Sequence, residues 1–328
     1  MATIYEVAEL AGVSPATVSR VLNGKTVRPP HERSVKAAIA ELGYRPSRRA
    51  RSLRTKQSEM IALIIPDIEN PFFTSLARGA EHVTRKAGYS LVLCNTDDSP
   101  ENEVQYVETV QAEHMPGAIV AATGSGHSFT PLLDEGRPLV AVDRHIEDPR
   151  ADAVMADNLA GAIEATEWHV RQGRERIACI SGQPSVETAR ERVRGWREVV
   201  DRAGGAPDEY LIWSDYHVLG GDSAMRRLLS LPNPPDAVVV ANNLMAIGAL
   251  TALAQLGVST FDIGVSVCGT LPYVISAPPG VHTVPLPARE IGERAARLLL
   301  GRIDGDTEPA RTIVLDSDGA DVRSREPR

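Results

Sequence analysis

Short apolar runs alternate with longer amphipathic stretches from residue 60 onward, and this alternation constrains the fold more than any other feature of the 328 residues. Such runs are typical of strands buried on both faces, and the intervening stretches are long enough for helices that connect parallel strands. The apolar runs occupy residues 60–66, 91–95, 117–122, 139–143, 177–181, 237–241 and 265–269. The clearest helical stretches are residues 73–86, 160–171, 187–203 and 244–256.

The two series of strands predict an α/β core of two lobes with parallel sheets flanked by helices. The first lobe is expected at about residues 60–160 with a late return of the chain, and the second at about residues 161–290. Parallel sheets bind ligands at the carboxyl ends of their strands, so a cleft between the lobes is the expected pocket.

Residues 3–43 show a different pattern, that of three short helices. Thr3 and Glu6 form the capping sequence T-x-x-E of the first helix, and Gly12 permits a tight turn after it. Ser14 is a strong N-cap, and Pro15 suits the first turn of a second helix that continues to about residue 23. A third helix is expected over about residues 29–42. The residues expected to face inward are Ile4, Val7, Ala8, Leu10, Ala11, Val18, Val21, Leu22, Val35, Ala38, Ile39 and Leu42.

Charge separates this N-terminal region from the rest of the chain. Residues 1–56 carry eleven Lys and Arg against four Asp and Glu, whereas residues 57–328 carry 24 against 39. Two short helices joined by a Gly-containing turn, with a third in support, form a helix-turn-helix whose second helix enters the major groove of double-stranded DNA. Arg20 is the best candidate for base recognition, because a guanidinium can bond both O6 and N7 of guanine. The alternative is a stable three-helix bundle with a solvated Arg20.

A basic segment, residues 45–56, joins the two regions. A helix this short is unstable alone in water, so it would form only when it pairs with the same segment of a second copy of the chain and packs against DNA. The alternative is a solvated linker open to proteolysis, which is the state expected away from DNA. We expect a DNA-binding domain at residues 1–45, a hinge at 46–58, and an effector-binding and dimerisation domain at 59–328.

Several classes of protein are disfavoured by the sequence. The three cysteines are scattered through apolar runs and are expected to be reduced core residues. No apolar run is long enough for a membrane span and the first residues lack a signal-peptide pattern, so a cytoplasmic protein without a membrane partner is expected. The P-loop, G-x-G-x-x-G after a strand, HExxH and metal-ligand spacings are absent from the sequence. We therefore predict no catalytic residue, metal or cofactor, and the basic N-terminal region disfavours a transport binding protein.

The run T-I-Y-E-V-A-E-L-A-G-V-S-P-A-T-V-S-R-V-L-N-G, residues 3–24, resembles the DNA-binding domain of the lac repressor (LacI/GalR) family. The resemblance implies phosphate contacts by Tyr5 and Ser14, and it places Pro15 and Ala16 at the pair that varies with operator sequence. Arg28 departs from the family, whose members usually have a capping Ser there. The DNA-contacting positions implied by the resemblance are Tyr5, Ser14, Pro15, Ala16, Thr17, Ser19, Arg20 and Asn23.

Ala50 and Leu53 resemble the Ala-x-x-Leu element of the family's hinge helix, which enters the minor groove of DNA. In that role Leu53 would be a wedge that partly unstacks a central base step and kinks the DNA. Each N-terminal domain would bind one half-site, so a homodimer on a near-palindromic operator is expected. An effector between the lobes would alter the spacing of the two hinges, which needs a coupling of only about 1–3 kcal/mol.

The resemblance extends through N-P-F-F at 70–73, V-D-R at 142–144, A-R-E-R-V-R-G-W at 189–196 and A-N-N-L-M-A-I-G-A-L at 241–250. It implies a two-lobed core similar to that of periplasmic sugar-binding proteins. Arg192 would anchor ligand oxygens, Asn242 would bond hydroxyls and Tyr216 would stack on a ring. The effector-binding positions are then Phe73, Asp143, Arg144, Thr188, Arg192, Tyr216, Asn242 and Leu271.

These positions also have purely structural alternatives. Phe73 could belong to the core, and Asp143 and Arg144 could cap the end of a strand. Arg192 could pair with Glu187 or Glu191 on one solvated helix.

Leu271 is the departure with the largest consequence for the effector. Family members commonly have Gly-aromatic-Asp-Asp where this chain has the run 269–272, Gly-Thr-Leu-Pro, so Leu271 replaces a carboxylate that binds sugar hydroxyls. Leu286 occupies another commonly polar position. Because a buried hydroxyl without a partner costs about 1–3 kcal/mol, we expect an effector other than an ordinary free hexose: less hydroxylated, partly apolar, or anionic and bound by Arg144 and Arg192. The alternative is a regulator that has lost its small-molecule response.

Overall fold

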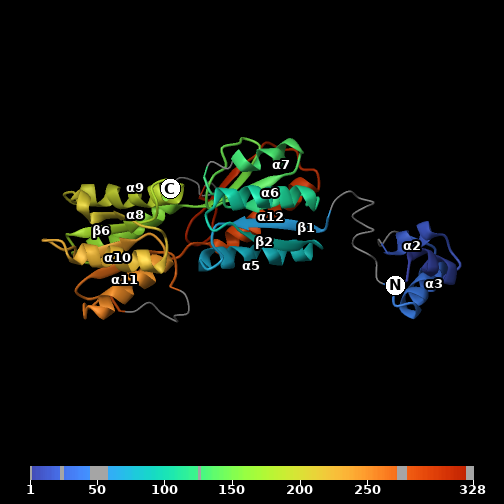
Figure 1. Ribbon diagram of the computed structural model, residues 1–328, viewed down its shortest axis with the longest axis horizontal. Coiled ribbons are helices and arrows are strands. Elements are labelled where there is room, and N and C mark those ends of the chain that lie inside the picture. The colour runs from blue at the N-terminus through green and yellow to red at the C-terminus, as the bar shows by residue number, and fades with distance from the viewer. Residues whose placement is uncertain (1, 23–25, 45–57, 125–126, 272–278, 323–328) are drawn as a thin grey trace. The chain divides into compact units, whose positions relative to one another are not determined.

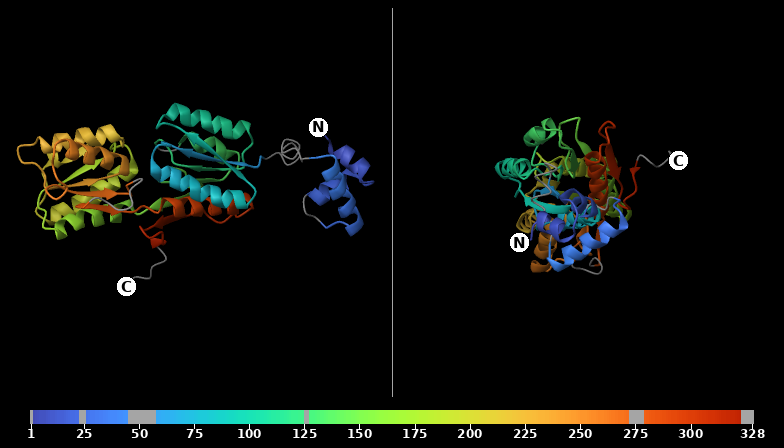
Figure 2. Two further views of the ribbon diagram at one scale, coloured as in Figure 1. Left: turned by 90° about the horizontal axis from the view of Figure 1, so that it is seen from below. Right: turned by 90° about the vertical axis from the view of Figure 1, so that its right-hand side faces the viewer.

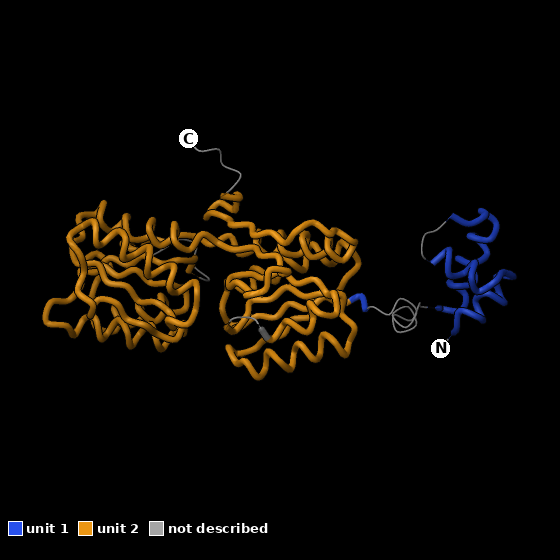
Figure 3. The backbone as a smooth tube through the Cα atoms, turned by 90° about the horizontal axis from the view of Figure 1, so that it is seen from above, with its two compact units in different colours: residues 1–59 blue, residues 60–328 orange. Residues whose placement is uncertain are grey.

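The computed structural model describes residues 2–22, 26–44, 58–124, 127–271 and 279–322. The chain divides into two compact units, Met1–Glu59 and Met60–Arg328, which are coloured separately in Figure 3. The expected contacts of Asn23, Ala50 and Leu53 with DNA lie outside the described residues, as does nearly all of the expected hinge.

The N-terminal unit contains helices α1 (Ile4–Leu10), α2 (Pro15–Leu22) and α3 (Pro29–Glu41). The expected capping box is present: the Thr3 amide donates to the Glu6 carboxylate at 2.6 Å, and the Glu6 amide donates to the Thr3 hydroxyl at 3.3 Å. The small core consists of Val7, Ala8, Val18, Val35 and Ala38. Leu10 and Leu42 were expected to face inward but are 46% and 36% exposed, because each stands at the end of a short helix where the core no longer covers it.

The first lobe of the core is built on a six-stranded parallel sheet in the order β11-β5-β4-β3-β1-β2. Side chains of β1 alternate between two cores: Ile61, Leu63 and Ile65 pack with α5 and α12, whereas Ala62 and Ile64 pack with α6 and α7. Figure 2 shows α5 and α12 on one face of the sheet and α6 on the other. The elements are β1 (Met60–Ile65), α5 (Pro71–Lys86), β2 (Ser90–Asn95), α6 (Pro100–Ala112), β3 (Ala118–Val120), the 3-10 turn η1 (His127–Phe129), α7 (Thr130–Asp134), β4 (Leu139–Val142), β5 (Asp152–Ala156), α12 (Ala288–Ile303) and β11 (Thr312–Leu315).

The second lobe is built on a five-stranded parallel sheet in the order β10-β9-β8-β6-β7. Helices α8 and α9 pack together on one face, and α10 and α11 pack together on the other (Figure 1). Its elements are α8 (Asn158–Arg171), β6 (Ile177–Ser181), α9 (Glu187–Arg202), the 3-10 turn η2 (Asp208–Tyr210), β7 (Leu211–Trp213), α10 (Val218–Leu229), β8 (Ala237–Val240), α11 (Asn243–Gln255), β9 (Gly264–Cys268) and β10 (Val281–Val284).

The expected two-lobed α/β fold is confirmed, and its late return consists of α12 and β11. Three helices begin before their apolar periodicity does, because the side chains of Asn70, Asp157 and Asn242 accept hydrogen bonds from the first-turn amides of α5, α8 and α11. The strands that the sequence did not distinguish, β5, β7, β10 and β11, have three to five residues, and polar or small residues interrupt several of them.

The three cysteines, Cys94, Cys179 and Cys268, are buried and free, as expected. Burial raises the pKa of the Cys94 thiol to about 11. Within the described ranges, no helix combines the length and apolar character needed to cross a membrane.

Helices α5 and α12 lie side by side in the first lobe (Figure 2), and glycines lie at their contact. A Cβ atom at Gly292 would overlap the carbonyl oxygen of Leu76, and one at Gly79 would overlap the carbonyl oxygen of Arg289. Gly301 lies on the same helix as Gly292, but the nearest atom to a Cβ there is a carboxylate oxygen of Asp306 at 3.9 Å.

Substitution of Gly292 by Ala is therefore expected to lower the free energy of unfolding by about 1–3 kcal/mol, because the helices must move apart. The matched variant Gly301→Ala should be neutral or raise it by up to about 1 kcal/mol, since Ala favours helix and meets open space. Urea denaturation of both variants measures the difference, and equal effects would contradict the packing argument.

Candidate functional site

The exposed face of α2 carries most of the residues expected to contact DNA. Pro15, Ala16 and Arg20 are exposed, whereas Thr17 and Ser19 are half-buried. Tyr5 on α1 is 72% exposed. The Thr17 amide donates to the Ser14 hydroxyl at 3.2 Å, so Ser14 caps α2 and orients its first turn. This face presents a cation, hydroxyls and small apolar groups, which are the kinds of group that contact base edges in the major groove of DNA.

The cap of α3 departs from the usual design. Arg28 stands at the N-cap position, and its side chain makes no capping hydrogen bond. Pro29 and Pro30 begin α3 and have no N–H to cap. The next two amides donate to the Arg28 carbonyl at 3.0 and 3.2 Å, so the first turn is satisfied without a side-chain acceptor.

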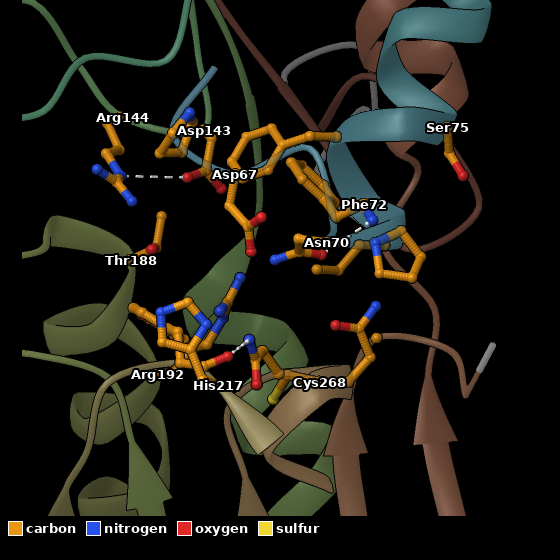
Figure 4. Close-up of a pocket in the computed structure, with 18 of the residues that line it drawn as sticks. Asp67, Asn70, Phe72, Ser75, Asp143, Arg144, Thr188, Arg192, His217 and Cys268 are labelled. Carbon is orange, nitrogen blue, oxygen red and sulfur yellow. Dashed lines mark hydrogen bonds and ion pairs between the residues drawn. The ribbon is translucent and has the colours of Figure 1, made fainter. Parts of the chain in front are cut away.

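A cleft in the second unit lies where strands of both sheets end, as expected for parallel sheets. Figure 4 shows side chains that enter it from the two lobes, with Asp67, Asn70 and Phe72 on one side and Arg192, His217 and Cys268 on the other. Of the eight expected effector-binding residues, the cleft is lined by Phe73, Asp143, Arg144, Thr188, Arg192, Tyr216 and Asn242.

Leu271 does not line this cleft. Its side chain is partly buried against the core of the second lobe, and Thr270 is exposed to the cleft instead. An apolar side chain gains more from that core than from a polar cleft. Leu286, the second departure from a polar position, does line the cleft.

Arg144 is buried, and nearby carboxylates balance its positive charge. Its guanidinium lies 2.8 Å from the Asp98 carboxylate and 3.5 Å from that of Asp143, and it donates to the carbonyl of Ala122 at 3.1 Å. Burial lowers the pKa of Arg144, but Asp143 and Asp98 together raise it above its ordinary value. The charge of Arg144 is therefore balanced within the protein.

Asp143 stands in a strained turn at the end of β4. Its φ is 62°, and the Arg144 amide donates across it to the Val142 carbonyl at 2.6 Å. Burial raises the pKa of the Asp143 carboxyl, and Arg144 and Arg192 act in the opposite direction. Such strain is common at functional sites, where the surrounding structure maintains it.

Arg192 makes none of the local ion pairs considered from the sequence. It is 5% exposed; Nε and Nη2 donate to the Asn158 side-chain oxygen at 3.1 and 2.8 Å, and Nη1 donates to the Ala241 carbonyl at 2.8 Å. Glu191 bonds Asn158 instead, and Glu187 bonds His145. The solvated-helix alternative for Arg192 is therefore wrong.

Tyr216 and Asn242 form one linked wall of the cleft. The Asn242 side-chain amide donates to the Tyr216 carbonyl at 3.0 Å, and its oxygen caps α11 by accepting from the Met245 amide at 2.8 Å. Tyr216 has a φ of 67°, and its ring lies so close to Gly182 that a Cβ there would overlap it. These contacts fix the ring in the wall of the cleft.

Phe73 belongs to the core, and it also lines the cleft. It is 4% exposed within the apolar core of the first lobe. Its ring meets that of Phe72 edge to face with centroids 5.1 Å apart, and both residues belong to the first turn of α5.

Sequence reasoning missed several lining residues that lie at the end of a strand or just after it. Asp67 follows β1 by two positions, Asp215 follows β7 by two, and Cys268 is the last residue of β9. Position near the carboxyl end of an expected strand was the signal that could have found Asp67 and Cys268, but β7 was not recognised. The other missed residues lining the cleft include Asn70, Ser75, Asp98, His217, Asn243 and Thr270.

His145 and Glu187 connect the two lobes beside the cleft. The His145 ring nitrogen Nδ1 lies 2.9 and 3.0 Å from the two Glu187 carboxylate oxygens, and the His145 amide donates to the same group at 3.1 Å. Hydrogen bonding to Glu187 raises the pKa of His145, and the same bond lowers the pKa of Glu187.

No group of three or more His, Cys, Asp or Glu that could hold a metal ion occurs in the part of the chain that the structure describes. The cleft instead combines carboxylates, guanidinium groups, amides, hydroxyls and aromatic rings. Chemically, this set can bind a small ligand that has several oxygen atoms and a ring face.

Comparison with known protein families assigns both units. Residues 3–47 match the family of bacterial regulatory proteins, lacI family, and residues 58–316 match the periplasmic binding proteins and sugar binding domain of LacI family. The ribose operon repressor of Escherichia coli K12 is 36% identical over 320 residues, which span 96% of this chain and 97% of that repressor.

Solved structures resemble the chain over the same length. The lac repressor dimer bound to operator and the anti-inducer ONPF matches with a TM-score of 0.85 and 25% identity, covering 96% of each chain. The transcriptional regulator CelR in complex with cellobiose matches with a TM-score of 0.72 and 30% identity, covering 96% of this chain and 97% of CelR.

The His145–Glu187 pair predicts a pH-dependent contribution to stability. Because the pKa of His145 is raised, its contribution is complete below the ordinary value of 6.5 and is lost as pH rises through the raised value. Because the pKa of Glu187 is lowered, its contribution is present above 4.5 and is lost as pH falls through the lowered value. The His145–Glu187 pair therefore contributes most to stability between pH 4.5 and pH 6.5.

A His145→Gln variant, uncharged at every pH, should melt below the wild type at pH 6 and show a smaller deficit at pH 8.5. The side chains are 45% and 35% exposed, so solvent screening limits the effect to less than about 1 kcal/mol. Differential scanning calorimetry at both pH values measures it. A deficit of the same size at both would show that the charge of His145 has no role.

Proposed function

The chain belongs to the LacI family of bacterial regulatory proteins, and we propose that it is a homodimeric repressor that binds a near-palindromic operator and responds to a small neutral sugar. A DNA-binding regulator of this family is not an enzyme. Its action on the chromosome fits the cytoplasm of a bacterium. The family match and the polar cleft both favour this reading over a regulator without a small-molecule response.

The N-terminal unit supplies the DNA contacts in this proposal. Arg20 and Thr17 on α2 contact base edges, with Pro15 and Ala16 setting operator preference, while Tyr5 and Ser14 contact phosphates. The proposed contacts Ser19, Asn23, Ala50 and Leu53 complete the set, with Leu53 entering the minor groove as a wedge.

The charge balance of the cleft carries the proposal of a neutral effector. Four carboxylates line it, those of Asp67, Asp98, Asp143 and Asp215, against two guanidinium groups. Arg144 is already held by two of the carboxylates, and Arg192 by neutral acceptors. An anionic effector would meet a net negative surface, so the anionic alternative loses its support, whereas hydroxyls can bond to carboxylates, amides and the remaining N–H groups of Arg192.

A pentose such as D-ribose is the first candidate for this effector. The similarity to a ribose operon repressor supports it, and it agrees with the expectation of a ligand other than an ordinary hexose. Leu286 supports the same expectation, because it gives the cleft one wall that offers no hydrogen bond. Leu271 no longer bears on the effector.

The effector proposal predicts that D-ribose binds the full-length protein more tightly than D-glucose, and that ribose 5-phosphate binds more weakly than ribose by at least 10-fold. The carboxylates of the cleft repel the phosphate in this comparison. Isothermal titration calorimetry with the three ligands measures the order. A ribose 5-phosphate affinity equal to or above that of ribose would refute the neutral-ligand proposal.

The DNA proposal predicts that Arg20→Ala weakens binding to an operator, selected from random DNA by the wild type, by about 1–3 kcal/mol and relaxes specificity at one base pair. Lys36→Ala is the control, because it also removes one positive charge, but from α3, where Lys36 pairs with Glu32 at 2.7 Å. Fluorescence anisotropy measures the binding of both variants to the operator and to a random duplex. Equal losses on both duplexes for Arg20→Ala would contradict base recognition.

A further inference from the structure

Three N–H groups of the cleft arginine, Arg192, are already bonded within the protein before any ligand binds. A guanidinium has five N–H donors. Asn158 accepts two of those of Arg192 and Ala241 accepts one, at distances of 2.8–3.1 Å. Among the described residues, one N–H on each terminal nitrogen is therefore left to bond a ligand in the cleft that Arg192 lines.

Asn158 does not line the cleft, yet its side chain is fully used. Its oxygen accepts both bonds from Arg192, and its amide group donates to the Glu191 carboxylate at 3.1 Å and to the Ala156 carbonyl at 3.3 Å. The orientation of the amide follows from chemistry, because Arg192 has no acceptor and the other two partners have no donor. The residue is 4% exposed, so no bulk water competes for these bonds.

Asn158 supports Arg192 from a different helix, although its amide group also bonds Glu191 on the helix that carries Arg192. Arg192 belongs to α9, whereas Asn158 is the first residue of α8, directly after the chain leaves the first lobe at Ala156. The Asp157 side chain caps α8 and fixes the start of that helix. The flexible side chain of Arg192 is thus fixed by the short side chain of Asn158 on a neighbouring helix.

We propose that Asn158 is a positioning residue for effector binding, which sets affinity by holding the Arg192 guanidinium in place without touching the effector. The proposal rests on the proposed function, because it takes the cleft to be the effector site. Its physical basis is that an immobilised donor pair loses little conformational freedom when a ligand binds.

The first experiment measures D-ribose binding to full-length protein by calorimetry. Asn158→Ala is expected to weaken binding at least 10-fold, which corresponds to about 1.4 kcal/mol. The control Glu191→Ala removes the other side-chain partner of Asn158 but leaves the bonds to Arg192, and it should bind within about 3-fold of the wild type.

A double-mutant cycle separates positioning from a general structural role. In the Arg192→Lys background, the ammonium cannot make the two-fold contact with one oxygen, so adding Asn158→Ala should cost less than about 3-fold. An additive loss of 10-fold or more in that background would overturn the proposal, and so would wild-type affinity in Asn158→Ala alone.

The second experiment needs no ligand. The Nε–H resonance of Arg192, identified by its loss in Arg192→Lys, should exchange slowly with solvent in the wild type and in Glu191→Ala, and at least 10-fold faster in Asn158→Ala. Equal exchange rates in all three would overturn the proposal. If the exchange result is as expected but the wild type binds none of the sugars tested, the assignment of the effector fails while the positioning of Arg192 stands.

Discussion

Parallel strand pairing is the constraint on which the rest of the core depends. It directs the carboxyl ends of neighbouring strands to the same edge of each sheet, and the residues after those ends form most of the cleft. Because the two lobes are separate sheets joined by crossing segments, the cleft receives residues that lie more than a hundred positions apart, such as Asp67 and Cys268. The cleft therefore follows from topology before any individual side chain is considered.

Burial of charge shapes the chemistry of that cleft. Arg144 and Arg192 are both largely removed from water, which is tolerable only because each has several oxygen partners. The two are satisfied differently, Arg144 by carboxylates and Arg192 by an amide and a carbonyl. The charge of Arg144 is thereby balanced by direct ion pairs, whereas Arg192 has no carboxylate among its hydrogen-bond partners in the described residues.

Much of this arrangement could be predicted from the sequence, and the failures have physical causes. The apolar runs located β1, β4, β6, β8 and β9 within a residue or two at either end, because a strand buried on both faces must be continuously apolar. The sequence could not show which side chains bond each other in the folded protein. Glu187 and Glu191 are the acids nearest to Arg192 in sequence, but its partner Asn158 lies 34 positions away on another helix. Leu271 was assigned by its position in a motif, whereas its apolar character placed it against the core.

The glycine contacts between helices bear on how the second unit can move. In the second lobe, Gly221 and Gly248 allow α10 and α11 to approach as closely as α5 and α12 do in the first. Backbones in direct contact resist sliding, because a shear of even a fraction of an ångström drives atoms together. Each lobe should then behave as a stiff block, and ligand-driven rearrangement is confined to the few residues that cross between the lobes, including the stretch from Ala156 to Asn158.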